Sequence, residues 1–190
     1  MNEQMSENLS ETWNGETGGD MTRYTIAVLV DNEAGVLSQV AHLFSRKGYN
    51  IETLAVGCTA DPSVSRITIE IFTDEVRVLL LCNQLRKLIP VHSVKLLAPE
   101  GAIRRELVLI KVSAPDRQTR DEVIQIGNIF RASIIDITPK TLTLSLIGDD
   151  GKTSAFEELL REFRILELAR TGIVAIERGM NTITDTQAQG

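Results

Sequence analysis

Residues 30–37, Val-Asp-Asn-Glu-Ala-Gly-Val-Leu, combine a carboxamide, a glycine and the start of an apolar helix. Asn32 carries both hydrogen-bond donors and an acceptor. Gly35 can adopt backbone angles that a side chain would forbid. The first four N–H groups of a helix have no partner within it, and the helix dipole favours an anion at that end. This corner therefore predicts a binding site for an anionic ligand.

The glycine pattern of this corner argues against a nucleotide. It contains one glycine, and neither GxGxxG nor GxxxxGK[ST] occurs in it. A single carboxylate fits better, and a free amino acid presents a carboxylate beside an ammonium group. We therefore expect the corner to bind an amino acid. A simpler alternative, in which Asn32 only caps the helix that follows, stays open at this point.

The composition disfavours several other classes of function. The 190-residue chain has a net charge of −6, whereas phosphate binding needs clustered Lys and Arg, so we expect no nucleic-acid partner. Aromatic residues make up 4%, which is too few for base-stacking platforms. No apolar run reaches the roughly 18–20 residues of a membrane-spanning helix, so we expect no membrane contact.

Cysteine and histidine are too sparse to indicate a metal site. Cys58 and Cys82 form no CxxC pair and are expected to be reduced thiols of a cytoplasmic protein. His42 falls on the polar side of its predicted helix, and His42 and His92 cannot build a zinc site without distant ligands. We predict neither a metal site nor catalytic residues.

Hydrophobic periodicity places the corner between a strand and a helix. From Val36 to Phe44 apolar residues recur every three or four positions, as on a helix with one buried face, and Gly48 ends that helix. The predicted elements of this half are strands over residues 23–30, 50–59, 65–72 and 92–98, and helices over 36–47 and between 73 and 90, the second of them capped by Thr73 or Asp74. This βαββαβ order is typical of a ferredoxin-like fold.

The same order of elements repeats after a linker at residues 99–101. Two capping boxes, Thr119 with Glu122 and Ser154 with Glu157, are predicted to open the helices of this half. Its predicted strands cover residues 106–112, 132–137, 141–147 and 165–169. The corner motif is not repeated, because Ala-Pro-Asp-Arg occupies its place in the second half. We therefore assign the ligand to the first half and expect the second to have another task, such as binding a protein.

The predicted fold class is α+β, with two ferredoxin-like βαββαβ domains at residues 23–98 and 102–178. Residues 1–22 are polar and acidic and lack the basic start and apolar centre of a secretion signal. They are predicted to form a disordered extension, in which Trp13 has no assigned role. Residues 179–190 are predicted to be a flexible tail.

A set of motifs in both halves points to a known family. The first half contains DNEAGVL at 31–37, LFSRKGYNIE at 43–52 and a turn through Asp61-Pro62 and Ser65-Arg66. Together these resemble an ACT domain, and more narrowly the regulatory (small) subunit of acetolactate synthase, also called acetohydroxyacid synthase. The run Phe130-Arg131-Ala132 through Pro139 and the triplet Arg170-Thr171-Gly172 are similar to the C-terminal domain of that family. The resemblance covers roughly residues 23–179.

The resemblance implies a non-catalytic regulatory subunit with an N-terminal ACT domain and a C-terminal ACT-like domain. Such a subunit binds and activates the large catalytic subunit, which carries thiamine diphosphate, magnesium and FAD, and itself holds no cofactor. It confers feedback inhibition by a branched-chain amino acid, usually valine. Valine, leucine and isoleucine all stay open here, because one methylene changes binding by only about 1–3 kcal/mol.

The resemblance also assigns the site residues. ACT domains of this kind pair side by side across a homodimer into an eight-stranded sheet, with effector sites at the seam. On that pattern one protomer supplies Asn32, Ala34, Gly35, Val36 and Leu37, and the other protomer supplies Asn50 and Ile51.

Three alternatives stay open on the sequence. A two-ACT amino-acid sensor that controls transcription or another enzyme would share the corner but need no synthase partner. A ferredoxin-like acyl-phosphate hydrolase would need an arginine in a phosphate-cradling loop, and this corner has acids instead. A purely structural module would bind no amino acid.

Overall fold

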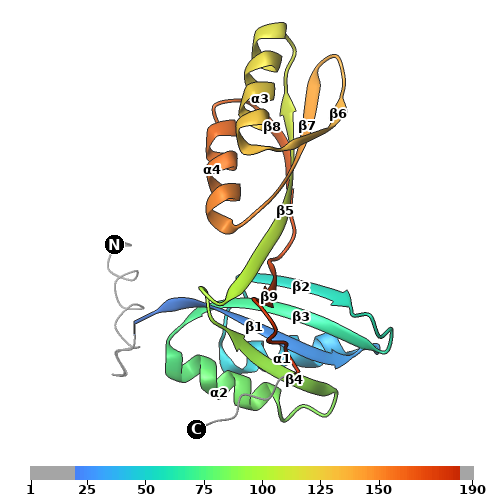
Figure 1. Ribbon diagram of the computed structural model, residues 1–190, viewed down its shortest axis with the longest axis vertical. Helices are drawn as coiled ribbons and strands as arrows, with labels where there is room; N and C mark the ends of the chain where they lie inside the picture. Colours follow the sequence, from blue (N-terminus) through green and yellow to red (C-terminus); the bar gives the residue numbers. More distant parts are fainter. Residues whose placement is uncertain (1–19, 185–190) are drawn as a thin grey trace, which may run out of the picture.

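The computed structural model describes residues 20–184 and places two βαββαβ units one above the other (Figure 1). The first unit comprises β1 (Thr22–Asp31), α1 (Val36–Lys47), β2 (Thr53–Cys58), β3 (Val64–Thr73), α2 (Glu75–Leu85) and β4 (Val91–Leu97). The second comprises β5 (Ala102–Ser113), α3 (Arg117–Phe130), β6 (Ser133–Ile137), β7 (Thr141–Gly148), α4 (Asp150–Leu160) and β8 (Ile165–Arg170), and a short strand β9 (Val174–Glu177) follows.

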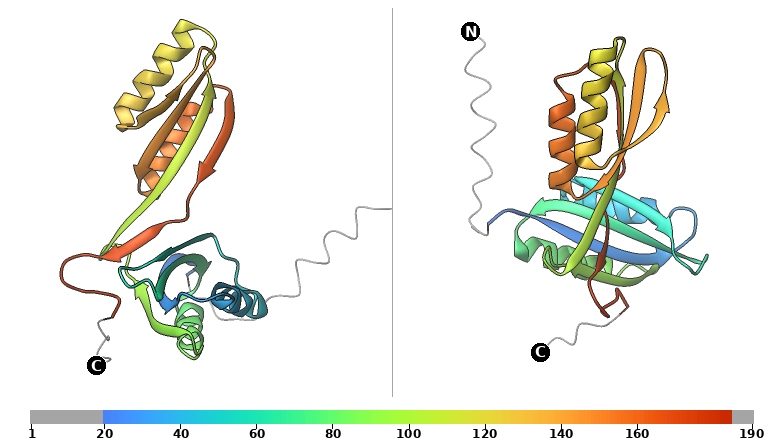
Figure 2. Two further views of the ribbon diagram at one scale, coloured as in Figure 1. Left: turned by 90° about the vertical axis from the view of Figure 1, so that its right-hand side faces the viewer. Right: turned by 45° about the horizontal axis from the view of Figure 1, so that its top comes forward.

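The first sheet has the antiparallel order β2-β3-β1-β4, with α1 and α2 on the face that points away from the second unit (Figures 1 and 2). Alternation along β1 sends Ile26, Val28 and Val30 into the core on the helical face. The apolar stripe of α1, which includes Leu43 and Phe44, covers them. The buried area of this core is what holds the β1–α1 corner in place.

The second sheet repeats this arrangement, with the order β6-β7-β5-β8 and α3 and α4 on one face. Val108, Ile110 and Val112 of β5 are buried against Phe156 of α4 and the stripe of α3. The predicted class, two ferredoxin-like units of α and β structure, is therefore confirmed.

The helix starts of the second unit differ from those predicted. Asp116 caps α3 by accepting a hydrogen bond from the Thr119 amide at 2.8 Å, and Asp149 caps α4 through the Lys152 amide at 3.0 Å. The two predicted capping boxes were wrong, because an aspartate three residues earlier in α3 and five residues earlier in α4 offers an equally good acceptor and lengthens each helix. The cap predicted at Asp74 of α2 is confirmed, since its side chain accepts from the Arg77 amide.

Strand β5 takes part in both units. Its second half pairs with β7 and β8, and its first four residues, Ala102–Arg105, pair with β9. We call residues 102–105 and 173–177 the β5–β9 ribbon. Ala102, Ile173 and Ala175 of this ribbon are buried against Ala27 and Leu97, on the face of the first sheet that the helices leave free. The sequence assigned these residues to the second domain, yet they pack on the first.

The end of the described chain also contacts the first unit. Ser93 of β4 donates to the carbonyl oxygen of Ile183 at 2.6 Å, and Lys95 Nζ donates to that of Thr182 at 2.8 Å. These hydrogen bonds place residues 182 and 183 of the predicted flexible tail against β4. Residues 185–190, and residues 1–19 of the predicted extension with Trp13, lie outside the described residues. Between residues 20 and 184, every helix is too short or too polar to cross a membrane.

Candidate functional site

The corner between β1 and α1 depends on a left-handed glycine. Gly35 has φ 88° and ψ −14°, and α1 begins at the next residue, Val36. Among residues 20–184, no side chain forms a capping hydrogen bond at the start of α1. The alternative in which Asn32 is a simple helix cap is therefore wrong. In the first turn of α1, the Val36 amide makes a long hydrogen bond of 3.4 Å to the Glu33 carbonyl oxygen, and the exposed Leu37 and Ser38 come next, where amides can face solvent or a ligand.

The side chain of Asn32 is bound to the hairpin formed by β2 and β3. Its Nδ2 donates to the carbonyl oxygen of Pro62 at 2.9 Å, and its Oδ1 accepts from the Ser65 hydroxyl at 3.0 Å. Nδ2 also lies 3.5 Å from the sulfur of Cys58, toward which its second hydrogen points, and sulfur is a weak acceptor. A carboxylate could accept from this hydrogen at little cost to the protein.

A rigid turn holds Pro62 in place. Asp61 accepts from both the hydroxyl and the backbone N–H of Ser63, at 2.6 and 2.9 Å. These two hydrogen bonds, the hydroxyl first, lower the pKa of the Asp61 carboxyl. The backbone of Asn32 joins the same turn by donating to the Ser63 carbonyl oxygen at 2.7 Å. The turn predicted at Asp61-Pro62 therefore positions the side chain of Asn32.

The remaining predicted contacts of the corner are accessible through their backbone. Ala34, Gly35 and Leu37 are exposed, whereas the side chain of Val36 is buried in the core. Val36 can therefore contact a ligand only with its backbone. On the other flank of the corner, His92 Nε2 lies 2.7 Å from Asp31 Oδ1, a contact that the sequence did not reveal.

The other two predicted site residues lie elsewhere in the same chain. Asn50 and Ile51 follow α1, at the end of the helix opposite to Gly35, and this 12-residue helix is about 18 Å long. The exposed side chain of Asn50 donates to Glu52 Oε1 at 3.2 Å, and Ile51 packs at the margin of the core. One chain therefore does not bring the two halves of the predicted site together.

Strand β2 forms an open edge of the first sheet. Leu54 and Val56 pair with Ile69 and Ile67 of β3, so their side chains lie on the face of the sheet that carries the helices. They are nevertheless 36% and 48% exposed, because no other strand of residues 20–184 pairs with the outer edge of β2. An unpaired edge of this kind offers backbone donors and acceptors to a further strand.

Two pockets among residues 20–184 lie away from the corner. One of about 390 Å³ separates β2 and β3 from the β5–β9 ribbon, and its lining includes Ala55, Gly57, Arg66 and Ile176. A wider depression follows β4 and α2. Neither pocket includes Asn32 or Gly35 in its lining.

The described residues give no metal site, and their thiols differ in access. Residues 20–184 contain no group of three or more His, Cys, Asp or Glu side chains that could hold a metal ion. Cys58 is exposed beside Asn32. Cys82 is buried in α2, and burial raises the pKa of its thiol to about 11.

Comparison with known proteins decides the family. Residues 26–93 match the sequence model of the AHAS small subunit-like ACT domain, and residues 105–179 match that of the small subunit of acetolactate synthase. A probable acetolactate synthase small subunit from Methanothermobacter thermautotrophicus is 45% identical over 160 residues, which cover 84% of this chain and 95% of that protein. This chain belongs to the acetolactate synthase small subunit family. The resemblance predicted from its motifs is confirmed.

Other members of the small subunit family agree in sequence and in structure. The acetolactate synthase small subunit of Aquifex aeolicus is 44% identical over 163 residues, covering 86% of this chain and 85% of that protein. The crystal structure of the small subunit from Thermotoga maritima is 35% identical and superimposes with a TM-score of 0.78, covering 83% of this chain and 98% of that one. The agreement extends over both units.

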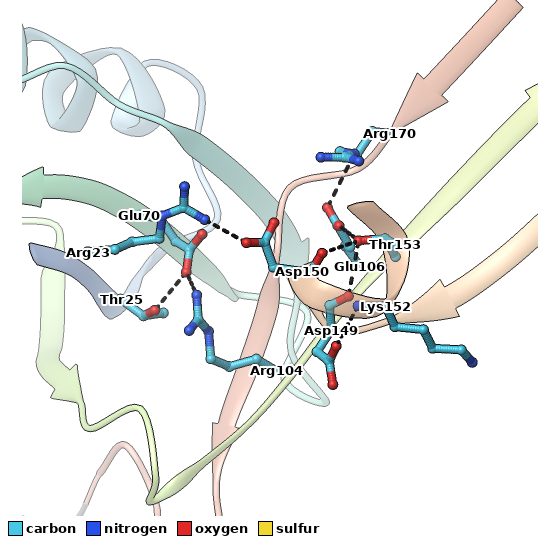
Figure 3. A network of polar contacts seen from close by, with 10 residues as sticks. All are labelled: Arg23, Thr25, Glu70, Arg104, Glu106, Asp149, Asp150, Lys152, Thr153 and Arg170. Carbon is cyan, nitrogen blue, oxygen red and sulfur yellow. Dashed lines mark hydrogen bonds and ion pairs between the residues drawn. The ribbon is translucent and has the colours of Figure 1, made fainter. Parts of the chain in front are cut away.

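The Arg170-Thr171-Gly172 triplet of this small subunit has a structural explanation. Arg170 pairs with Glu157 at 2.9 Å. It also pairs with the buried Glu106 at 3.7 Å, and Glu106 accepts from the Thr153 hydroxyl (Figure 3). The Thr171 hydroxyl accepts from the Leu107 amide at 3.0 Å. The triplet therefore fixes the end of β8 before the chain turns back to the first sheet.

Proposed function

We propose that this chain is a non-catalytic regulatory subunit of acetolactate synthase. It binds the large thiamine-diphosphate-dependent catalytic subunit, raises its activity and makes it sensitive to a branched-chain amino acid, with valine as the first candidate. Family membership supports the partner, and the uncapped start of α1 beside the half-free carboxamide of Asn32 supports the effector. Thiamine diphosphate, magnesium and FAD belong to the catalytic subunit.

A homodimer completes the effector site. Two-fold symmetry pairs β2 with the β2 of a second copy in antiparallel fashion, which brings the Thr53 end of one strand beside the Cys58 end of the other. Because Cys58 contacts Asn32, this pairing carries Asn50 and Ile51 of one protomer to the corner of its partner. The open edge of β2 is the observation that supports this arrangement.

The chemistry of the completed site suits an amino acid with an apolar side chain. The free N–H groups of α1 and the second amide hydrogen of Asn32 receive the carboxylate. Leu37, Leu54 and Val56 are exposed apolar residues that can line the side-chain end of the ligand. A ligand with so few heavy atoms is expected to bind with a Kd of about 10 μM to 1 mM.

The experiment that tests this function is calorimetry with valine, leucine and isoleucine, followed by assays of the catalytic subunit with and without this chain. Asn32→Ala should weaken amino-acid binding by about 1–3 kcal/mol, since it removes a charge-assisted hydrogen bond, and should leave activation intact. Asn128→Ala, at an exposed position of α3, is the matched control.

Each part of the proposal can fail separately. Unchanged inhibition by valine in Asn32→Ala would show that the site is elsewhere. Catalytic activity that does not respond to the chain would remove the regulatory role, and a pull-down without a thiamine-dependent enzyme would favour the two-ACT sensor.

A further inference from the structure

The β2–β3 hairpin contacts both the candidate effector site and the β5–β9 ribbon. On the site side, Asn32 binds the turn of the hairpin through Pro62 and Ser65. At the other end, the segment that follows Asn50 joins the same hairpin, because the Glu52 amide donates to the Glu70 carbonyl oxygen at 2.9 Å. A ligand that draws these segments together therefore acts directly on β2 and β3.

Gly172 lies directly on the backbone of β2. A Cβ at this position would meet the carbonyl oxygen of Leu54 at 2.4 Å and the nitrogen of Ala55 at 2.9 Å. The obstacle is backbone rather than a flexible side chain, so no side chain fits while β2 and the ribbon stay in place. This contact lies immediately after the Arg170-Thr171 anchor of β8.

Arg66 forms a second contact between hairpin and ribbon. Its guanidinium donates to the carbonyl oxygen of Ala175 in β9 at 2.6 Å, and burial lowers its pKa. Arg66 is the register partner of Gly57 on β2. The bond therefore links β9 to the strand pair at the proposed seam.

A buried ion pair forms the third contact (Figure 3). Glu70 of β3 is fully buried, and its Oε1 accepts from the Thr25 hydroxyl at 2.9 Å and from Arg104 of the ribbon. Near the same junction, Arg23 of β1 pairs with Asp150 of α4 at 3.1 Å. The ribbon is thus fixed to the first sheet by packing and by charge.

One strand of the ribbon runs unbroken into the second unit. Residues 102–105 continue without interruption into the part of β5 that lies between β7 and β8. On the other strand, Thr171 is bonded to Leu107 of β5. A displacement of the ribbon relative to β2 therefore has to move the second sheet as a whole.

We infer that the β2–β3 hairpin and the β5–β9 ribbon transmit amino-acid binding at the dimer seam to the second unit, with Gly172 and Arg66 as positioning residues. This inference rests on the proposed function, since it assigns the second unit to the catalytic partner. It states that the two binding events are coupled through these contacts, and linkage requires such coupling to be reciprocal.

The test is the affinity of valine for the whole chain, alone and with saturating catalytic subunit. In the natural chain the two dissociation constants should differ by roughly 5–150-fold, the usual range of allosteric coupling. Gly172→Ala should bring this ratio close to one, while the affinity of the free chain stays within about twofold. Gly101→Ala is the matched control, because its methyl group would meet Ala98 at an ordinary 3.7 Å.

Arg66→Met keeps the test decisive if Gly172→Ala does not fold, and it should reduce the ratio at least about threefold. Hydrogen exchange supplies a structural readout, since valine should change the exchange of ribbon amides 102–105 and 174–177 in the natural chain. The inference would be overturned, and the proposed function left standing, by either of two results. One is a ratio of valine dissociation constants in both variants equal to that of the natural chain, and the other is hydrogen exchange of the ribbon amides that does not respond to bound valine. A natural chain that binds no branched-chain amino acid would overturn the proposed function and this inference with it.

Discussion

The hydroxyl of Ser65 donates to Oδ1 of Asn32 at 3.0 Å, although 33 residues separate the two in sequence. With Oδ1 occupied, the amide nitrogen must face Pro62 and Cys58. The orientation of the carboxamide at the candidate site is therefore set by β3. The N–H donor of Asn32 is therefore already oriented before a ligand binds.

Ser65→Ala tests this orientation. The variant loses one neutral hydrogen bond and leaves the amide of Asn32 intact, so amino-acid affinity should fall by about 0.5–1.5 kcal/mol, less than in Asn32→Ala. Calorimetry measures the difference, with Ser133→Ala on β6 as the control. A loss greater than that of Asn32→Ala would mean that the serine itself contacts the ligand.

Gly35→Ala should destabilise the first unit by about 1–2 kcal/mol, because φ 88° is strained for a residue with a Cβ. Urea unfolding followed by circular dichroism measures the change. Gly57→Ala on β2 is the control, since its φ is ordinary and nothing lies within 4 Å of the added methyl group. Equal stability of the two variants would show that the corner relaxes without cost.

The two thiols should react at very different rates. At pH 8 a thiol reagent should modify exposed Cys58 readily and leave buried Cys82 unmodified, because burial raises the Cys82 pKa to about 11 and hides its sulfur. Saturating valine should slow the reaction of Cys58, which lies 3.5 Å from the Asn32 amide. Mass spectrometry of the modified peptides measures both effects. If valine does not change the rate at which Cys58 is modified, the ligand binds elsewhere.

Arg104→Met should cost about 3–5 kcal/mol, because it leaves Glu70 as an uncompensated charge in a fully buried place. Glu70→Gln with Arg104→Met should recover part of that loss, since the amide still accepts from Thr25. A double-mutant cycle in denaturant measures the coupling. Additive effects of the two changes would show that the pair contributes nothing to stability.

The cap of α3 should make stability depend on acid. The amide of Thr119, and then its hydroxyl, lower the pKa of Asp116. The folded pKa is thus below the unfolded value of about 3.9, so the stabilisation is complete above that value and is lost as the pH falls through the folded pKa. Asp116→Asn should therefore differ from the natural chain near neutral pH and converge with it in acid. Unfolding measured between pH 2 and 7 checks this, with Asp121→Asn as the control.

Local patterns were enough to predict most of the fold. The three-and-four spacing in α1 reflects its one buried face, which any packed core requires. The apolar alternation in β3 marks the face toward the helices, but the other face, with Thr68 and Glu70, is buried as well because the β5–β9 ribbon covers it. The cap of α3 was misplaced because Asp116 with Thr119 and Thr119 with Glu122 both satisfy the spacing of a helix start. Only the geometry of the preceding loop, where Asp116 is extended, distinguishes them.

The features that could not be predicted from the sequence are contacts between segments distant along the chain. The pairing of Ala102–Arg105 with Val174–Glu177 has no signal in the sequence, because no short turn connects the two segments. The contact of Ser65 with Asn32 depends on the register of β1 against β3, which hydrophobic alternation leaves open by two-residue steps. The corner itself was found because its glycine and carboxamide are adjacent in the chain.

The β5–β9 ribbon also determines which truncated forms of the protein can fold. A fragment that stops at Ala98 would strip the cover from Ala27 and Leu97 and leave the carboxylate of Glu70 facing water without its guanidinium. Such a truncated ACT module should be prone to aggregate during expression, even though its helical side is intact. The sequence suggests two separable domains. A chimaera made by exchanging one of them with a homologous protein should nevertheless fold only if both strands of the ribbon, residues 102–105 and 173–177, come from the same parent.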